Sequence, residues 1–396
     1  MNRHCPLIVA LLAVTVFASP GLALDQAHRE KAKQVIARSI EFLRSSQNED
    51  GSWTPKPGPA VTAMVAAGML RQPDIDTSDP AVAKALDYVL SQRQDDGGIY
   101  EGILPNYNTS IALMALGQVS DDERVAEVIA EAHDFLRGLQ WAEGDTDPDG
   151  QTITRDHPWY GGAGYGNSGR PDMSNTNLML EGLYQSGMDC NDPAFQRALV
   201  FIARCQGAEA NDMFKDLIEM DGGFIYSTSV NKDAIGVPES KASPEQIERA
   251  KSGKPLNSRL RTYGSMTYAG FKSYVYALLE KDDPRVVNAM KWIRRNFTLE
   301  QNPGLRDYAG TEVDERMQGY YYYLHTFAKA LHAWGEPTIT DADGVAHDWA
   351  NELIAKLADV QREDGSFINE HDRWMEGDPN LVTAYALLAL QTALGR

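Results

Sequence analysis

One short segment occurs near both ends of the chain, and it constrains the fold more than any other feature. Residues 47–53 read QNEDGSW, and residues 361–367 read QREDGSF. In both places an apolar helical pattern precedes the segment, and a Thr-Ala pair opens a second apolar run soon after it. A unit found at both ends predicts that the middle of the chain is built from the same unit.

Further copies of this unit lie between the two ends, each with glycine in its turn: Gly97-Gly98, Gly161-Gly162, Gly222-Gly223 and, in degenerate form, Gly304. The predicted helix before each turn is charged on one face, whereas the helix after it consists mainly of small and apolar residues. The first pattern is typical of an outer, solvated helix and the second of an inner helix that is packed on both sides. Six such pairs without a convincing strand pattern predict an all-α fold, an α/α toroid with a cavity at its axis.

The longest connection between repeats covers residues 227–262. It is polar and carries a net positive charge in an otherwise strongly acidic protein. A connection of this length without a clear helical pattern is usually either functional or disordered. We therefore expect either a lid over a site or a solvated excursion.

Residues 1–23 have the features of a signal peptide. A short basic region precedes an apolar run at residues 7–18, and small residues follow at Gly21 and Ala23. The apolar run is too short to span a bilayer, which takes about 20 residues, and no later stretch is long enough either. We expect export to a periplasm or the medium, leaving residues 24–396 as a single toroid domain.

The formal net charge of the chain is -19. Nucleic-acid binding needs a basic face, so the charge argues against a nucleic-acid partner. Solubility alone accounts for an acidic balance of this kind.

The repeated unit resembles the repeat of squalene cyclases and protein prenyltransferase β subunits, over about residues 29–394. This resemblance implies the six-fold α/α toroid and an aromatic-lined central cavity that binds isoprenoid chains. Squalene cyclases protonate their substrate with an Asp in an Asp-x-Asp-Asp-Thr-Ala motif. Here residues 172–177 read DMSNTN, so Asp172 and Thr176 match, but Ser174 replaces the proton donor. A hydroxyl cannot protonate an alkene, and typical cyclisation is therefore not implied.

Protein prenyltransferases hold zinc with an Asp-x-Cys pair and a His from the following repeat. His325 matches that His, but residues 265–267 read SMT where the Asp-x-Cys pair belongs. We therefore predict no metal and no cofactor. Arg259 is a loose match to the diphosphate-binding Arg of that family.

A site is expected at the end of the cavity where the glycine turns lead into the inner helices, because helix N-termini there favour an anion. Asp172, Ser174 and His325 are the catalytic candidates. The alternative roles are an N-cap for Asp172 and a hydrogen-bonded wall residue for His325. The substrate-binding candidates are Trp159, Tyr160, Asn175, Arg259, Tyr263, Tyr268, Lys272, Tyr322 and Asp378.

Two classes of function follow. The first is a protein that binds or transforms an isoprenoid or another apolar ligand in its central cavity. The second is a different use of the toroid, either a non-catalytic binding protein or an enzyme acting on polysaccharide. The second use would draw on the loop acids Asp145, Asp147, Asp149 and Asp156 and on the basic insertion. An apolar, aromatic cavity favours the first class, and an open, polar cavity favours the second.

Overall fold

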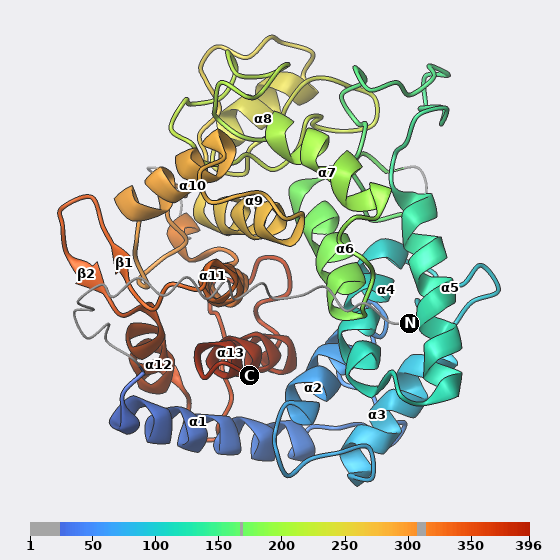
Figure 1. Ribbon diagram of the computed structural model, residues 1–396, viewed down its shortest axis with the longest axis vertical. Helices are drawn as coiled ribbons and strands as arrows, with labels where there is room; N and C mark the ends of the chain where they lie inside the picture. Colours follow the sequence, from blue (N-terminus) through green and yellow to red (C-terminus); the bar gives the residue numbers. More distant parts are fainter. Residues whose placement is uncertain (1–23, 167–168, 307–313) are drawn as a thin grey trace, which may run out of the picture.

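The computed structural model describes residues 24–166, 169–306 and 314–396, and within them the chain forms thirteen α-helices, of which twelve are arranged in two concentric rings (Figure 1). The predicted signal peptide, residues 1–23, lies outside the described residues. Among the residues that are described, no helix has the length and apolar character needed to cross a membrane.

Six of these thirteen helices form the inner ring. Each packs against the next in chain order, and the last packs against the first, so the ring is closed. The inner helices are α2 (Ala60–Leu70), α4 (Pro105–Leu116), α6 (Met173–Gln185), α9 (Gly264–Tyr276), α11 (Tyr320–Trp334) and α13 (Pro379–Ala393). The outer helices are α1 (Gln26–Ser45), α3 (Pro80–Ser91), α5 (Glu123–Leu139), α7 (Pro193–Arg204), α10 (Pro284–Arg295) and α12 (Trp349–Val360). This arrangement confirms the predicted all-α toroid.

The inner and outer helices differ in how many of their residues are buried, because they differ in residue type. In α2 every residue except Leu70 is buried, because its small and apolar side chains pack on all sides. In α1 the buried residues form one stripe, which includes Ala32, Val35, Ile36 and Leu43. Spacings of three and four residues place such a stripe on one face of a helix. Inner helices therefore form the core, and outer helices cover it.

The repeated glutamine fastens neighbouring repeats. Gln47 Nε2 donates to the Gly51 carbonyl of its own turn at 3.0 Å and to the Ala81 carbonyl in the first turn of α3 at 2.9 Å. Gln140 and Gln206 make the equivalent pairs of bonds. Gln361 reaches the Val35 carbonyl in α1 at 2.9 Å, which joins the last repeat to the first.

The glycine of the turn is required by space as well as by backbone conformation. Gly161 has φ +83°, in the left-handed region that favours glycine. A Cβ at this position would lie 1.9 Å from the carbonyl oxygen of Arg197 in α7. The turn therefore brings its backbone against the next outer helix, and only glycine permits that approach.

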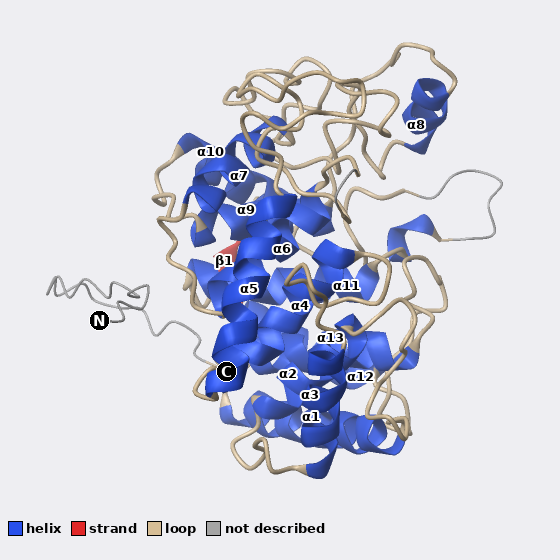
Figure 2. Cartoon of the chain, turned by 90° about the vertical axis from the view of Figure 1, so that its right-hand side faces the viewer, coloured by secondary structure: helices blue, strands red, loops and turns tan. Residues whose placement is uncertain are grey.

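Some short elements were not predicted. The insertion contains helix α8 (Pro244–Lys251), and a hairpin of β1 (Ile339–Thr340) and β2 (Ala346–His347) precedes α12. Two 3-10 turns, η1 (Gly117–Val119) and η2 (Glu315–Met317), complete the secondary structure of the described chain. Figure 2 shows that the long loops, with α8 among them, lie on one side of the helix rings, whereas the C-terminus lies on the other.

Candidate functional site

A cavity of about 190 Å³ lies at the end of the toroid where the inner helices begin. Every inner helix contributes to its wall, and the loops that lead into those helices complete it. The lining residues are Pro57, Ala60, Val61, Leu104, Tyr107, Tyr165, Ser174, Tyr226, Tyr263, Ser265, Met266, Gly319, Tyr322, Trp374, Met375, Glu376, Leu381 and Tyr385. Most of these side chains are apolar or aromatic.

Tyrosine rings dominate the wall. The rings of Tyr322 and Tyr385 lie 5.9 Å apart between centroids, and the hydroxyl oxygens of Tyr107 and Tyr385 are 3.5 Å apart. Burial raises the pKa of Tyr322 and Tyr385 well above that of an exposed tyrosine. These hydroxyls are therefore neutral at physiological pH, and the wall combines apolar ring surface with hydrogen-bonding groups.

Ser174 and Tyr322 meet in the cavity. Their hydroxyl oxygens are 3.0 Å apart, and they come from the first turns of α6 and α11. Both residues, together with Tyr263, were predicted site residues and do line the cavity. Neither a serine nor a neutral tyrosine is a strong acid, so this part of the site favours hydrogen bonding over proton donation.

Glu376 is the one carboxyl among the described residues that line the cavity, and it was not among the predicted site residues. Its side chain is almost fully buried, at 1% exposure. One carboxylate oxygen accepts from the backbone N–H of Tyr322 at 2.8 Å, and the other accepts from Asn369 Nδ2 at 2.6 Å. Burial raises the pKa of Glu376 to about 7, although these hydrogen bonds favour the ionised form. No local pattern around residue 376 indicates this role, because the loop must fold back onto α11 to create it.

Backbone conformation is unusual at the mouth of the cavity. Leu104, Trp374 and Met375 have φ values of +52°, +56° and +67°. Side chains other than glycine rarely adopt such values, and residues held there cluster at functional sites. All three line the cavity, so the strained positions coincide with the candidate site.

Asp172 caps the N-terminus of α6. Its Oδ1 accepts from the Asn175 backbone N–H at 2.9 Å, and its Oδ2 accepts from Asn175 Nδ2 at 2.9 Å. Burial raises the pKa of Asp172. Neither Asp172 nor Asn175 is among the residues that line the cavity. The geometry matches the capping role considered for Asp172.

Three other candidates lie deeper between the inner helices. Lys272 forms an ion pair with Glu181, at 2.5 Å between Nζ and Oε2. His325 is buried with its ring 5.3 Å from that of Tyr385, and Tyr268 packs on Tyr323. None of the three candidates lines the cavity.

The remaining candidates are not among the described residues that line the cavity. Trp159 and Tyr160 belong to a separate apolar cluster with Ile153. Asp378 caps α13 by accepting from the backbone N–H of Asn380 at 2.8 Å. Arg259 is exposed on the insertion.

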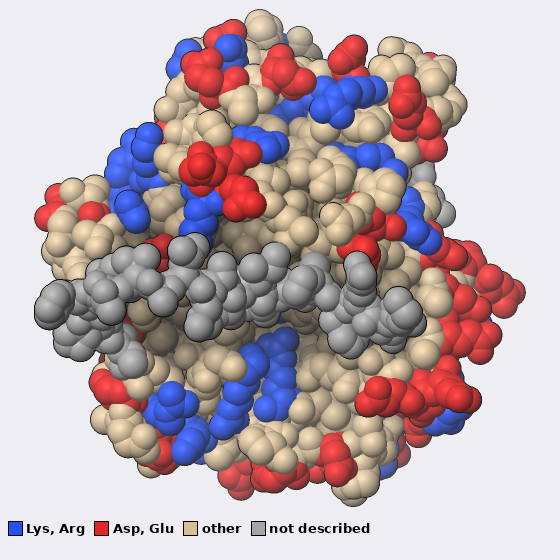
Figure 3. Space-filling view, in the orientation of Figure 1, with Lys and Arg blue, Asp and Glu red and all other residues tan. Residues whose placement is uncertain are grey.

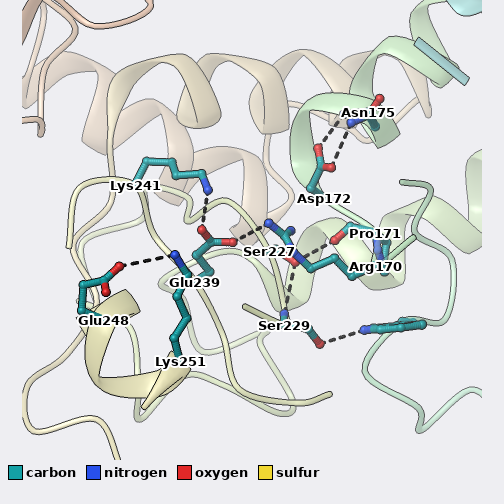
Figure 4. A network of polar contacts seen from close by, with 11 residues as sticks. Arg170, Pro171, Asp172, Asn175, Ser227, Ser229, Glu239, Lys241, Glu248 and Lys251 are labelled. Carbon is teal, nitrogen blue, oxygen red and sulfur yellow. Dashed lines mark hydrogen bonds and ion pairs between the residues drawn. The ribbon is translucent and has the colours of Figure 1, made fainter. Parts of the chain in front are cut away.

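A buried ion pair ties the insertion to the loop that precedes α6 (Figure 4). Glu239 is buried and accepts from Arg170 Nη2 at 2.6 Å and from Lys241 Nζ. Both cations also lie over the ring of Tyr226, with Lys241 Nζ 4.5 Å from its centroid. Because Tyr226 lines the cavity, the insertion is packed beside the site and supports its wall.

The acidic loop of the third repeat is internally bonded. Asp147 accepts from the backbone N–H groups of Asp149 and Gln151 at 2.9 and 2.8 Å, and it lies 3.1 Å from His157 Nε2. The acids of this loop are not among the cavity-lining residues. In the described parts of the chain, no group of three or more His, Cys, Asp or Glu residues is arranged to hold a metal ion.

Comparisons with known proteins found one matching family and several solved structures of similar fold. Residues 16–103 match the squalene-hopene cyclase C-terminal domain family. The chain resembles the squalene cyclases. A search among curated proteins found no significant match.

Solved structures show the same overall fold. A variant of the type II terpene cyclase MstE from Scytonema, bound to merosterolic acid A, matches over 93% of this chain and 99% of its own, with 13% identity and a TM-score of 0.52. Another MstE variant, bound to the substrate geranylgeranyl dihydroxybenzoate, matches over the same shares with 13% identity and a TM-score of 0.50.

A glycosidase is equally similar. An inactive variant of the α-1,6-mannanase GH76A of Salegentibacter sp., in complex with α-1,6-mannotriose, matches over 92% of this chain and all of its own, with 10% identity and a TM-score of 0.54. At these identities the likenesses establish the toroid fold alone.

Proposed function

We propose that the protein binds an isoprenoid or a similar apolar molecule in the cavity at the N-terminal ends of the inner helices. The observation that carries this proposal is the composition of the wall, where tyrosine, leucine, valine and methionine side chains surround a single carboxyl among the described lining residues. Binding sites for apolar ligands have this character, with a few polar groups that fix orientation. The geranylgeranyl group in the MstE complex is a ligand of the same chemical class.

The volume of the cavity limits the size of the ligand. It measures about 190 Å³, whereas an engineered apolar cavity of roughly 150 Å³ holds one benzene molecule. The cavity therefore suits about one or two isoprene units. We expect a short terpenoid, or the end of a longer chain that leaves through the mouth beside Trp374.

The polar groups favour binding over cyclisation. Ser174 occupies the position at which squalene cyclases carry their proton-donating Asp. Glu376 is the available acid, and a carboxylic acid with a pKa of about 7 is too weak to protonate an unactivated alkene. Glu376, Ser174 and Tyr322 instead suit hydrogen bonds to an alcohol or carbonyl at one end of the ligand.

The polysaccharide alternative receives less support from the site. Glycosidases place two carboxyl groups on either side of the scissile bond. In the described wall of the cavity, Glu376 is the only carboxyl. The similarity to the mannanase is a similarity of fold alone.

The binding proposal is tested by titrating the protein with geraniol, geranylgeraniol and α-1,6-mannotriose, using calorimetry and native mass spectrometry. We expect geraniol to bind and mannotriose not to bind. Val61 lies in the wall, so Val61→Trp should fill the cavity and weaken geraniol binding at least tenfold. Val345→Trp places the same change on the surface, where Val345 is 53% exposed, and should leave binding unchanged.

Overpacking of a core costs about 1–3 kcal/mol, so thermal unfolding must show that Val61→Trp is folded. Ala60→Leu provides a milder version of the same test. Geraniol binding that is equal in the wild type and in a folded cavity-filling variant would reject this site. Saturable binding of mannotriose would favour the polysaccharide function.

We further propose that residues 1–23 direct export. Their basic, apolar and small-residue pattern supports this proposal. Expression in a bacterium, followed by N-terminal sequencing of the periplasmic and secreted fractions, should yield a chain that begins at Leu24. Recovery of the protein only from the cytoplasm with Met1 retained would contradict it.

A further inference from the structure

A second cavity, of about 610 Å³, lies at the opposite end of the toroid, where the inner helices end. Arg71 follows α2, Tyr276 ends α9 and Lys329 lies in the last half of α11. Figure 3 shows this end of the molecule, and Lys and Arg side chains gather near its centre. The cavity is distinct from the tyrosine-lined one, with which it shares no lining residue.

The charge of this cavity opposes that of the whole protein. Its described wall contains Arg71, Lys329 and Arg396, but no Asp or Glu. The full chain carries 56 acidic residues against 37 basic ones. A wall with cations and no carboxylate is therefore a local reversal, and it favours negatively charged ligands.

Arg71 is a cation of this wall whose side chain has no partner among the described residues. It is half-buried, and its guanidinium makes no hydrogen bond or ion pair with any described residue. Burial lowers its pKa. Basic side chains near helix ends often bond to the last carbonyl groups, but within the described chain Arg71 does not. Its five N–H groups are available to a ligand.

One buried carboxylate, that of Glu181, neutralises part of this positive charge. Glu181 is fully buried between Lys272 and Lys329 and forms ion pairs with both. These two lysines hold the pKa of Glu181 well below its usual range, although burial alone would raise it. Burial lowers the pKa of Lys329 to about 8, and nearby Arg71 contributes to this shift. One carboxylate cannot neutralise two ammonium groups and a guanidinium, so positive charge remains uncompensated.

The rest of the wall is apolar and aromatic. The rings of Tyr184 and Tyr276 are stacked, with centroids 4.4 Å apart and an interplanar angle of 10°. Met114, Val275 and Leu278 extend this surface, and Leu278 is 52% exposed. A cavity of about 610 Å³ falls within the usual range for small-molecule sites, roughly 300–1,000 Å³.

We propose that this second cavity binds an organic anion with an apolar body. Arg71 and Lys329 hold its carboxylate or phosphate group, and the stacked Tyr184 and Tyr276 rings contact its apolar part. Guanidinium and ammonium groups both form charge-assisted hydrogen bonds with such oxyanions. The proposal is independent of the ligand in the tyrosine-lined cavity.

Calorimetric titration of the full chain with sodium octanoate, octyl phosphate, inorganic phosphate and octanol tests this proposal. We expect saturable binding of octanoate, octyl phosphate or both, and the comparison identifies the preferred oxyanion. Octanol lacks the anionic group and inorganic phosphate lacks the apolar body. Each should therefore bind at least tenfold more weakly than the octyl anions. Octanol that binds as tightly as the anions would show an apolar pocket only and would overturn the proposal, as would the absence of binding by both octyl anions.

The variant Arg71→Gln identifies the site. Because Arg71 has no partner among the described residues, its replacement should leave the fold intact and weaken binding of the octyl anion at least tenfold. Arg294→Gln removes the same charge from the exposed face of α10 and should have no effect. The titrations are repeated in Val61→Trp, which blocks the tyrosine-lined cavity. Equal affinity in wild type and Arg71→Gln would place the anion elsewhere and reject the assignment.

Discussion

Glu376 is a carboxyl that stays partly protonated at neutral pH. A pKa of about 7 leaves roughly half of the molecules protonated near pH 7. The protonated form donates a hydrogen bond and the ionised form only accepts. The same residue therefore presents two different hydrogen-bonding surfaces to a ligand, depending on pH.

The raised pKa of Glu376 also predicts a pH dependence of stability. The unfolded chain releases this proton near pH 4.5 and the folded chain near pH 7, so between these values the folded state binds more protons. Stability then falls as pH rises through this window. Between pH 5 and 8 the loss from this group is roughly 2–3 kcal/mol. The Glu376→Gln variant cannot lose this proton. Between pH 5 and 8, its free energy of unfolding, measured in urea, should therefore fall by roughly 2–3 kcal/mol less than that of the wild type.

Comparing the variant with the wild type at each pH removes the contributions of other titrating groups. Thermal unfolding over the same pH range provides a second measurement. Parallel pH profiles for the wild type and Glu376→Gln would show that the carboxyl titrates normally.

At the residue scale, the sequence predicted positions at the heads of inner helices better than positions in loops. Ser174, Tyr263 and Tyr322 were placed in the cavity because the repeat fixes where each inner helix begins, and the first turn faces the axis. Glu376 was missed because its position depends on a loop that folds back onto α11. Trp159 and Tyr160 were proposed from residue type alone, and the packing around Ile153 places them elsewhere.

At the scale of elements, the glycine turn is the part of the repeat that tolerates least change. Gly161→Ala should lower the free energy of unfolding by about 3 kcal/mol or more, because the new methyl group meets the Arg197 carbonyl and the backbone adopts a left-handed φ. Gly144→Ala is the matched control, since Gly144 has φ +96° but nothing within 4 Å of an added Cβ. It should cost only about 1–2 kcal/mol. Chemical denaturation measures both, and equal losses would mean that the close approach is unimportant.

The elements that the sequence predicted share a strong periodic pattern. Long helices with an apolar stripe and a glycine turn repeat often enough to be recognised. Helix α8 and the β1–β2 hairpin are too short to show a period. The fastening of the insertion through Glu239 and Arg170 joins residues 69 positions apart, and such a contact leaves no local signal in either segment.

At the scale of the whole molecule, the toroid has two chemically different ends. Helix N-termini and loops surround a tyrosine-lined cavity at one end, and helix C-termini surround a basic cavity at the other. Between them, Glu181, Lys272 and Lys329 form a buried ionic cluster within the inner ring. Closure of the inner ring therefore produces two separate cavities from one set of repeats.

The bond from Gln361 to Val35, which joins the last repeat to the first, also bears on how such a protein evolves. An open array gains or loses units at its ends, because each unit contacts only its neighbours. A closed ring has no end at which a unit can be added, and the loss of one unit would uncover the faces of two others. We expect the number of units to stay fixed among relatives of this protein, while their lengths differ in loops such as residues 227–262.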